Sequence, residues 1–339
     1  MEPQIPNMAH KMDRIYKQKP LKPHGKETKR LKTLAKTKNM DRRTWLELRR
    51  KGIGGSDVSI IAGINRFRSI YQLWLEKTGQ AQLEETDSEY AHFGTILEPL
   101  VKKEFMARTG KKIRAKNVIL QSEEHPFMLC DLDGVIYEEG EMCIFEAKTA
   151  SAYKQEVWEN GVPVEYILQV QHYMAVTGAR KAYVAALVGG NRFYMHTVRR
   201  DEELIGMITA MEREFWEKNV IGGAEPVPDG SEATTAFLSS RYGRCNGMTV
   251  ELPDSALEVI RRYEDASEQM KAAKERKDAL ANQLRSYLGE NEAGTVQGRT
   301  VTWKQITKTS FDSKRLEKEN RQIYDKYLTE SQYRRLSVA

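Results

Sequence analysis

Two carboxylates and a lysine between positions 133 and 148 have the types and spacing that metal-assisted phosphodiester cleavage requires. Asp133 and Glu146 each follow apolar runs typical of adjoining strands, and their oxygens are the hard ligands that Mg²⁺ or Mn²⁺ prefers. Ala147 would add its backbone carbonyl as a further ligand. Strand alternation places Glu146 and Lys148 on one face. The lysine ammonium would therefore orient a metal-bound water, or stabilise charge on the cleaved phosphate.

The same residues also allow a structural interpretation. Asp133-Gly134 is a common kind of turn between strands, and the alternation of Glu146 and Lys148 is typical of a solvated strand face. The runs before the two carboxylates, 127–129 and 143–145, are apolar, so we expect buried strands there. Acids at the ends of buried strands are costly unless a cation binds beside them, and this cost favours a metal site.

A glycine-rich segment over residues 52–55 separates Arg49 from Ser56 and precedes a predicted helix. Free N–H groups at a helix start, a hydroxyl and a neighbouring guanidinium together suit a phosphate. An ordinary helix cap at Ser56 is the structural alternative. The sequence contains no Gly-Lys-Ser/Thr phosphate-binding loop, so we expect no nucleotide cofactor.

A further acid, Glu98, lies in a predicted amphipathic helix that extends to Gly110 and is expected to bend at Pro99. Glu98 therefore either points into solvent or faces the carboxylates as a third ligand. The apolar residues of this helix recur at helical spacing: Phe93, Leu97, Leu100, Val101 and Phe105.

The composition suits a soluble protein rich in exposed helix, with 30% charged and 40% hydrophobic residues among 339. The sequence contains no apolar run of the ~18 residues that a membrane span needs, and no apolar signal-peptide core near residue 1. The three cysteines, Cys130, Cys143 and Cys245, are dispersed. We expect reduced thiols in a cytoplasmic protein, and four-cysteine iron–sulfur ligation within one chain is excluded.

Basic charge is concentrated near the start of the chain. The net charge is +6, yet residues 11–38 alone carry eleven lysines and arginines against two acidic residues. We expect residues 1–40 to be a disordered arm. Such an arm either holds DNA electrostatically or only keeps the protein soluble.

Periodicity predicts alternating helices and strands up to about residue 221. Helices are predicted over 42–51, from Ser56, over 69–79, up to Gly110, and over 163–177 and 201–219. Strands are predicted over 113–121, 126–131, 133–138, 142–148, 181–188 and 192–199. Helices and strands in this order indicate an α/β fold, with helices flanking one mixed sheet.

The predicted domain organisation is an arm over 1–40, a core over 41–221, a linker over 222–254 and a helical extension over 255–339. A shorter polar linker is expected over 80–88. The extension contains a long helix followed by a hairpin over 294–304 and a charged terminal helix. Alternating spacings of three and four give the long helix a coiled-coil-like seam: Tyr263, Ala266, Met270, Ala273, Lys277, Leu280, Leu284 and Tyr287.

The assembled segments resemble the YqaJ-type viral recombinases, a lambda-exonuclease-like family with a restriction-endonuclease-like PD-(D/E)XK core. The resemblance covers about residues 42–219. It depends on five segments in the family's order: Trp45 with Arg49 and Ser56, Phe93–Glu98, Asp133-Gly134, Glu146–Lys148 and Gln169–Gln171.

The resemblance implies a role for each matching position. Arg49 and Ser56 would grip a DNA phosphate, Glu98 would join the metal site, and Gln169 would help to hold the attacking water or the metal site. Leu132 stands where many relatives have proline, and the role of the additional acid Asp131 is not assigned.

The activity that the resemblance implies is an Mg²⁺-dependent exonuclease, with Mn²⁺ as a possible substitute. It would degrade linear duplex DNA from 5′ ends and leave 3′ single strands for phage-type recombination in a bacterial host cell. The implied partners are duplex DNA ends, a single-strand annealing protein and, in a homo-trimer, further copies of the chain; no membrane is expected. A structure-selective or nicking endonuclease on the same core is one alternative. A catalytically idle DNA-binding or scaffold protein is another, although intact Asp133, Glu146 and Lys148 argue against it.

Overall fold

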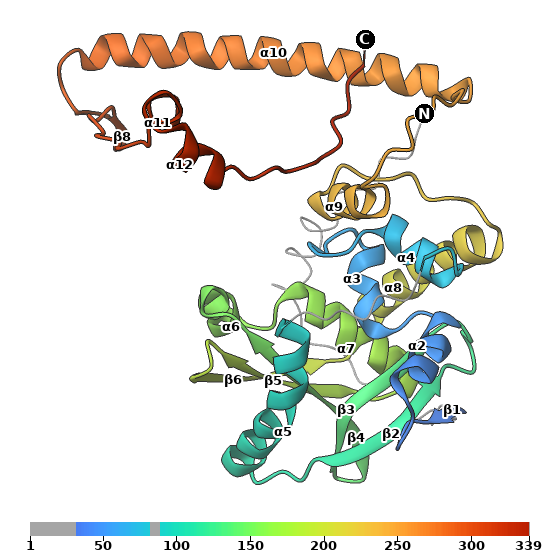
Figure 1. Cartoon of the computed structure of the whole chain (residues 1–339). Helices are drawn as coiled ribbons and strands as arrows, with labels where there is room; N and C mark the ends of the chain where they lie inside the picture. Colours follow the sequence, from blue (N-terminus) through green and yellow to red (C-terminus); the bar gives the residue numbers. More distant parts are fainter. Residues whose placement is uncertain (1–31, 82–88, 339) are drawn as a thin grey trace. The chain divides into compact units, whose positions relative to one another are not determined.

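The computed structural model describes residues 32–81 and 89–338 (Figure 1). The chain divides after Leu238 into two compact units. Helix α9 (Glu232–Arg241) lies inside the stretch 222–254 that we predicted as a linker. Part of that stretch is therefore helical.

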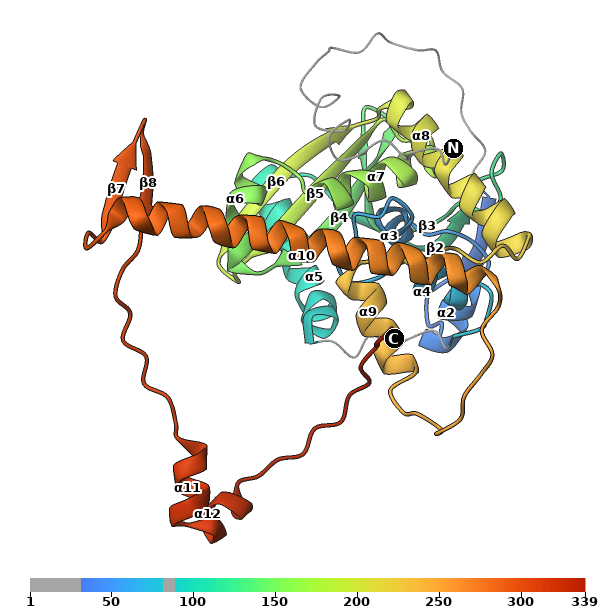
Figure 2. The ribbon, with the colours of Figure 1, turned by 90° about the horizontal axis from the view of Figure 1, so that it is seen from above.

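The first unit is built on one six-stranded sheet in the order β1 to β6 (Figures 1 and 2). Neighbouring strands are antiparallel except β4 and β5, which are parallel because helices carry the chain back between them. The predicted α/β fold with a mixed sheet is confirmed. The strands are β1 (Lys32–Lys36), β2 (Arg114–Gln121), β3 (Leu129–Glu138), β4 (Glu141–Ala150), β5 (Lys181–Val188) and β6 (Arg192–Arg199).

Side-chain alternation along the strands divides the core between the two faces of the sheet. On one face, buried Ile144 belongs to the cluster that includes residues of α7 (Val164–Thr177). The next residue, Phe145, points to the opposite face and packs against Phe105 of α5 (Glu89–Thr109), with ring centroids 4.9 Å apart. The helices α7 and α5 therefore cover opposite faces of β4.

The predicted turn at Asp133-Gly134 is wrong. The two strands expected over 126–131 and 133–138 are one continuous strand, β3, with both residues inside it. The chain turns instead at Glu139 and Gly140, which adopt positive φ values of 52° and 83° and join β3 to β4. In a two-residue hairpin loop, positive φ at both positions gives the turn the same twist as the flanking strands. Glu139 and Gly140 meet this requirement.

Part of the predicted disordered arm is also a strand. Lys32–Lys36 forms β1 and pairs with the edge of β2, so the arm cannot extend to residue 40 as an unstructured segment. Residues 1–31, the remainder of that arm, lie outside the described residues. Residues 82–88, most of the predicted linker over 80–88, are also outside them.

Most helices of the first unit agree closely with the predicted segments. Asp41 caps α2 (Arg42–Arg50) by accepting a hydrogen bond from the Thr44 N–H, and Ser69 caps α4 (Ile70–Lys77). Helix α3 begins one residue before the predicted Ser56 and covers Gly55–Ile61. The helix predicted over 201–219 is α8 (Glu202–Glu214) continued by the π-helical turn η2 (Phe215–Ile221). The short turn η1 (Ala152–Lys154) and α6 (Gln155–Asn160) precede α7 and were not predicted.

The second unit is dominated by the predicted long helix, α10 (Ser255–Leu288), which Figure 2 shows without interruption. The predicted hairpin is confirmed as β7 (Ala293–Val296) and β8 (Arg299–Thr302). Two short helices, α11 (Ser313–Glu319) and α12 (Arg321–Lys326), replace the single predicted terminal helix. The apolar seam residues Tyr263, Met270, Leu280, Leu284 and Tyr287 are exposed. Across the described ranges, none of the helices has the length and apolar character to cross a membrane.

Candidate active site

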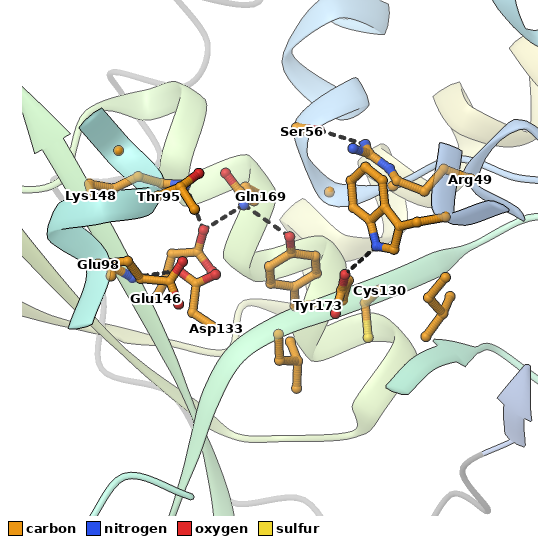
Figure 3. Close-up of a pocket in the computed structure, with 18 of the residues that line it drawn as sticks. Arg49, Ser56, Thr95, Glu98, Cys130, Asp133, Glu146, Lys148, Gln169 and Tyr173 are labelled. Carbon is orange, nitrogen blue, oxygen red and sulfur yellow. Dashed lines mark hydrogen bonds and ion pairs between the residues drawn. The ribbon is translucent and has the colours of Figure 1, made fainter. Parts of the chain in front are cut away.

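One cavity of about 540 Å³ in the first unit collects every predicted site residue (Figure 3). Its walls come from α2, α3, α5, β2, β3, β4 and α7, so segments distant in sequence converge on it. The predicted residues that line it are Arg49, Ser56, Glu98, Asp133, Glu146, Ala147, Lys148 and Gln169.

The carboxylates lie where β3 and β4 separate. The ladder between these strands ends at the pair Gly134–Phe145, and Asp133 and Glu146 are the next residues along each strand. Beyond that point, Asp133 Oδ2 accepts a hydrogen bond of 2.8 Å from the N–H of Ala147. The N–H and C=O of one strand residue point to the same side, so the carbonyl of Ala147 faces the same opening.

Glu146 is 2% exposed, and only one of its carboxylate oxygens is satisfied. Its Oε1 accepts hydrogen bonds of 2.6 Å from Lys148 Nζ and 2.6 Å from Gln169 Nε2. Its Oε2 is buried and has no hydrogen-bond partner among the described residues. Burial raises the pKa of this carboxyl, and Lys148 only partly opposes the shift.

The charge of Asp133, like that of Glu146, is only partly balanced by Lys148. Burial, followed by the neighbouring charge of Glu146, raises the pKa of its carboxyl to about 8, against the opposing charge of Lys148. A cation bound between Asp133 and Glu146 would satisfy the free oxygen of Glu146 and offset the charge of both groups. The carbonyl of Ala147 faces the same opening. This donor set of oxygens fits Mg²⁺ or Mn²⁺.

Lys148 stays positively charged in this site. Burial lowers the pKa of its ammonium, but the carboxylates of Glu146 and Asp133 outweigh burial, so the net shift is upward. Its Nζ also lies 4.8 Å from the ring centroid of Tyr166 on α7. The prediction that strand alternation brings Glu146 and Lys148 to one face is confirmed by their 2.6 Å ion pair.

Gln169 reaches the site from α7 and contacts Tyr173, which the sequence analysis did not predict as a site residue. Its Nε2 also donates to the hydroxyl of Tyr173, one helical turn later, at 2.9 Å. A Cβ atom added to Gly55 would lie 2.5 Å from the Tyr173 ring. Glycine at this position therefore lets α3 approach α7, and Tyr173 connects the Glu146 side of the cavity to the Ser56 side.

Glu98 lines the cavity rather than pointing away from it, and its role as a third metal ligand stays a prediction. Its side chain is about one-third exposed and forms an ion pair with Lys102, one turn later on α5. The described part of the chain contains no group of three or more His, Cys, Asp or Glu side chains that could hold a metal. Glu98 is therefore near the carboxylate pair without completing a three-acid cluster.

Arg49 and Ser56 are in direct contact on the other side of the cavity. The Nη2 atom of Arg49 donates a hydrogen bond of 2.8 Å to Ser56 Oγ (Figure 3). A Cβ atom on Gly54 would lie 2.9 Å from that nitrogen, so the glycine makes space for the guanidinium. Ser56 is not the helix cap. The N-cap residue of α3 is Gly54, whose N–H donates a hydrogen bond of 3.0 Å to the carboxylate of Asp57.

The carboxylate of Asp57 holds the Arg49 guanidinium in place, a role that the sequence analysis did not predict. It is buried, with Lys77 Nζ at 2.8 Å, Arg49 Nη2 at 3.6 Å and Arg68 Nη1 at 3.9 Å. Burial alone would raise the pKa of the Asp57 carboxyl, but Lys77, Arg49 and Arg68 outweigh it and hold the pKa well below its usual range. This carboxylate therefore keeps its charge and anchors Arg49.

Asp131, the acid without an assigned role, points into the same cavity as Asp133, as expected for residues two apart on β3. Its Oδ2 accepts a hydrogen bond of 2.7 Å from the indole Nε1 of Trp45. Burial raises the pKa of its carboxyl, opposed by that hydrogen bond and by the charge of Arg49.

Comparison with known proteins supports the resemblance drawn from these residues. A family model described as a YqaJ-like viral recombinase domain matches residues 44–180. The chain is 41% identical over 315 residues to the uncharacterized protein YqaJ of Bacillus subtilis (strain 168), covering 92% of this chain and 98% of that protein.

Solved structures resemble part of the chain at low sequence identity. An alkaline exonuclease of Laribacter hongkongensis, LHK-Exo, matches with 18% identity and a TM-score of 0.45, covering 59% of this chain and 97% of the other. A phage related exonuclease from Haemophilus somnus 129PT matches with 14% identity and a TM-score of 0.41, covering 53% of this chain and 100% of the other. The extent of the match to YqaJ, together with the domain match over the cavity-forming segments, decides the family. The chain belongs to the YqaJ-like viral recombinases.

Proposed function

We propose that the protein is a metal-dependent deoxyribonuclease that digests linear duplex DNA from its ends. The observation that carries this proposal is the cavity in which Asp133, Glu146 and Lys148 lie opposite the pair Arg49 and Ser56. Carboxylates and an ammonium suit cleavage of a phosphodiester, and a guanidinium with a hydroxyl suits retention of another phosphate.

Asp133, Glu146 and the carbonyl of Ala147 would hold the Mg²⁺ ion, with Mn²⁺ as a substitute. When bound, such an ion lowers the pKa of a coordinated water and neutralises charge on the phosphate. Glu98, restrained by Lys102, would act from the adjoining wall through a water molecule rather than as a direct ligand. The buried, unpartnered Oε2 of Glu146 is the feature that most strongly supports an ion here.

Lys148 and Gln169 would position the attacking water molecule. Both bind the same oxygen of Glu146, so their N–H groups converge on one point of the cavity. The charged ammonium of Lys148 can orient a water molecule for attack and stabilise the developing negative charge on the phosphate. Gln169 is itself held by the hydroxyl of Tyr173, so its hydrogen bond to Glu146 would fix the orientation of that carboxylate.

Arg49 and Ser56 would hold a phosphate of the DNA end by charge-assisted hydrogen bonds. Their mutual hydrogen bond keeps both donors pointed to one place before DNA arrives. We extend the proposal to attack from 5′ ends that leaves 3′ single strands, because a recombinase needs single-stranded DNA for pairing. A single-strand annealing protein and a homo-trimer around DNA belong to the same proposal.

Digestion of linear and covalently closed circular duplex tests this function. With Mg²⁺ present, labelled linear DNA should lose its 5′-labelled strand, while closed circles of the same sequence stay intact. EDTA and the Asp133→Ala variant should both stop the reaction. Nicked or linearised circles would instead indicate the endonuclease alternative, and intact linear DNA at all Mg²⁺ or Mn²⁺ concentrations would leave only a DNA-binding role.

A further inference from the structure

Asp131 has a partner that links the strand of the carboxylate site to the phosphate-binding pair. It lies on β3 two residues before Asp133, and both side chains open into the cavity. The hydrogen bond from Trp45 Nε1 to Asp131 Oδ2 joins β3 to α2, across 86 positions of sequence. Its length of 2.7 Å is at the short end of the normal range for an N–H donor.

Trp45 in turn supports Arg49, one turn later on α2. The guanidinium carbon of Arg49 lies 4.8 Å from the centroid of the Trp45 ring, within the range of a cation–π contact. Arg49 is thus fixed by three groups: the Trp45 ring, the Ser56 hydroxyl and the buried Asp57 carboxylate. Of these three supports, only the Trp45 ring is joined to β3 by a hydrogen bond.

From this geometry we infer that Asp131 is a positioning residue, which orients Arg49 through Trp45 and so sets where the DNA-end phosphate is held relative to the carboxylate site. The inference rests on the proposed function, in which Arg49 binds that phosphate. Strand β3 then positions two parts of the bound DNA end. Asp133 acts at the cleaved bond, and Asp131 acts, through Trp45 and Arg49, at the terminal phosphate. Without the Asp131 hydrogen bond, the indole can rotate, and the guanidinium loses its fixed support.

Three variants separate the parts of this linkage. Asp131→Asn keeps an oxygen acceptor for the indole N–H, and Asp131→Ala removes it. Trp45→Phe keeps a ring beneath Arg49 but removes the donor. The reference variant is Arg49→Ala, which removes the phosphate-binding group itself.

The measurement is the ratio of dissociation constants for duplexes with a 5′-hydroxyl and a 5′-phosphate. Fluorescence anisotropy in EDTA gives this ratio without cleavage, and circular dichroism confirms folding. The wild type should prefer the phosphorylated end, and Arg49→Ala should reduce that preference about tenfold, as expected for one hydrogen-bonded charge. Asp131→Ala and Trp45→Phe should each lower it several-fold, whereas Asp131→Asn should retain it. Asp131→Ala combined with Arg49→Ala should lower the ratio no further than Arg49→Ala, because both act through one guanidinium.

A wild-type ratio in both Asp131→Ala and Trp45→Phe, with Arg49→Ala impaired, would overturn the inference. Additive losses in the double variant would also overturn it, since Asp131 would then act independently of Arg49. If Asp131→Ala fails to fold, Trp45→Phe decides alone. A wild type without any preference for the 5′-phosphate refutes the inference together with the role of Arg49. Intact preference without digestion of linear DNA refutes only the proposed nuclease activity.

Discussion

Lys148 Nζ and Glu146 Oε1 lie 2.6 Å apart on one face of β4, while the second oxygen of Glu146 is buried without a partner among the described residues. The lysine therefore neutralises only part of the charge that Glu146 and the nearby Asp133 bring into the cavity. Under the proposed function a divalent cation would offset the remaining charge, and this makes separable predictions for the acids and for the lysine.

Asp133→Ala and Glu146→Ala should each abolish cleavage while the protein remains folded. Removal of a metal ligand forfeits several kcal/mol of transition-state stabilisation, so we expect a loss of at least roughly 10³-fold. Cleavage rates on linear duplex and circular dichroism provide the measurements. A folded alanine variant with near-normal Mg²⁺-dependent activity would place the catalytic centre elsewhere.

Lys148→Ala should separate chemistry from metal binding. The variant should lose roughly 10²-fold or more in turnover, yet still bind Mn²⁺ by isothermal titration, because both carboxylates and the Ala147 carbonyl remain. Lys148→Arg provides the charge-matched control. Loss of Mn²⁺ binding in Lys148→Ala would contradict this division of roles.

The metal-free protein should become less stable as pH rises from about 4 to about 8. The pKa of Asp133 is raised from its ordinary value of 3.8 to about 8 in the folded state, so across this window the folded state holds a proton that the unfolded state has released. The free energy of unfolding then falls with pH, by at most about 1.4 kcal/mol per pH unit for one proton. The raised pKa of Glu146 acts in the same direction.

Thermal unfolding in EDTA across this pH window tests that expectation. Asp133→Asn has no titrating carboxyl at this position, so its melting temperature should depend less on pH than that of the wild type. Added Mg²⁺ should stabilise the wild type more at pH 8 than at pH 6, since binding must displace fewer protons. Equal pH dependence in wild type and Asp133→Asn would show that Asp133 ionises normally.

The basic segment before β1 should contribute salt-dependent DNA binding rather than catalysis. Each phosphate neutralised by a lysine or arginine releases counterions, which steepens the salt dependence of the dissociation constant. Deletion of residues 1–31, which leaves Lys32–Lys36 in the sheet, should flatten that dependence and leave turnover at saturating DNA nearly unchanged. An unchanged salt slope would assign this segment to solubility alone.

The exposed seam of α10 should need a packing partner. Met270 and Leu280 are 73% and 54% exposed, although the spacing of the seam is that of a buried helix face. Met270→Glu combined with Leu280→Glu should change the melting temperature, the mass by light scattering or the binding of an annealing protein. A matched control changes Gln269 and Gln283, two exposed neutral residues outside the seam, to Glu. No difference between the two double variants in any readout would show that the seam has no structural task.

Local sequence patterns were sufficient for much of the fold. The strands over 181–188 and 192–199 were predicted with their observed limits, because Gly189, Gly190 and Asn191 mark the turn between them. The Asp133-Gly134 turn was predicted wrongly because local propensity favours a turn there. Pairing of β3 with strands on both sides overrides that propensity.

The residues that support the site could not be predicted in the same way. Gln169 was found through a family segment, but its partner Tyr173 has no local signature beyond helical spacing. Asp57 is surrounded by cations from three separate segments, and Trp45 meets Asp131 only after the chain has folded. Such contacts depend on tertiary structure, so a single sequence identifies the reacting groups before it identifies what holds them.

The hairpin turn at Glu139 and Gly140 also determines whether Asp133 and Glu146 are brought together. This two-residue loop sets which residue of β3 faces which residue of β4, and a slip by one position would exchange the two faces of a strand. Asp133 would then point away from Glu146, and Leu132 would occupy its place. A substitution such as Gly140→Val, where φ is 83°, can therefore inactivate the protein by mispairing two strands although it touches no group in the cavity. Loss of activity in such a variant would then result from wrong strand alignment during folding, with every side chain of the cavity unchanged in the sequence.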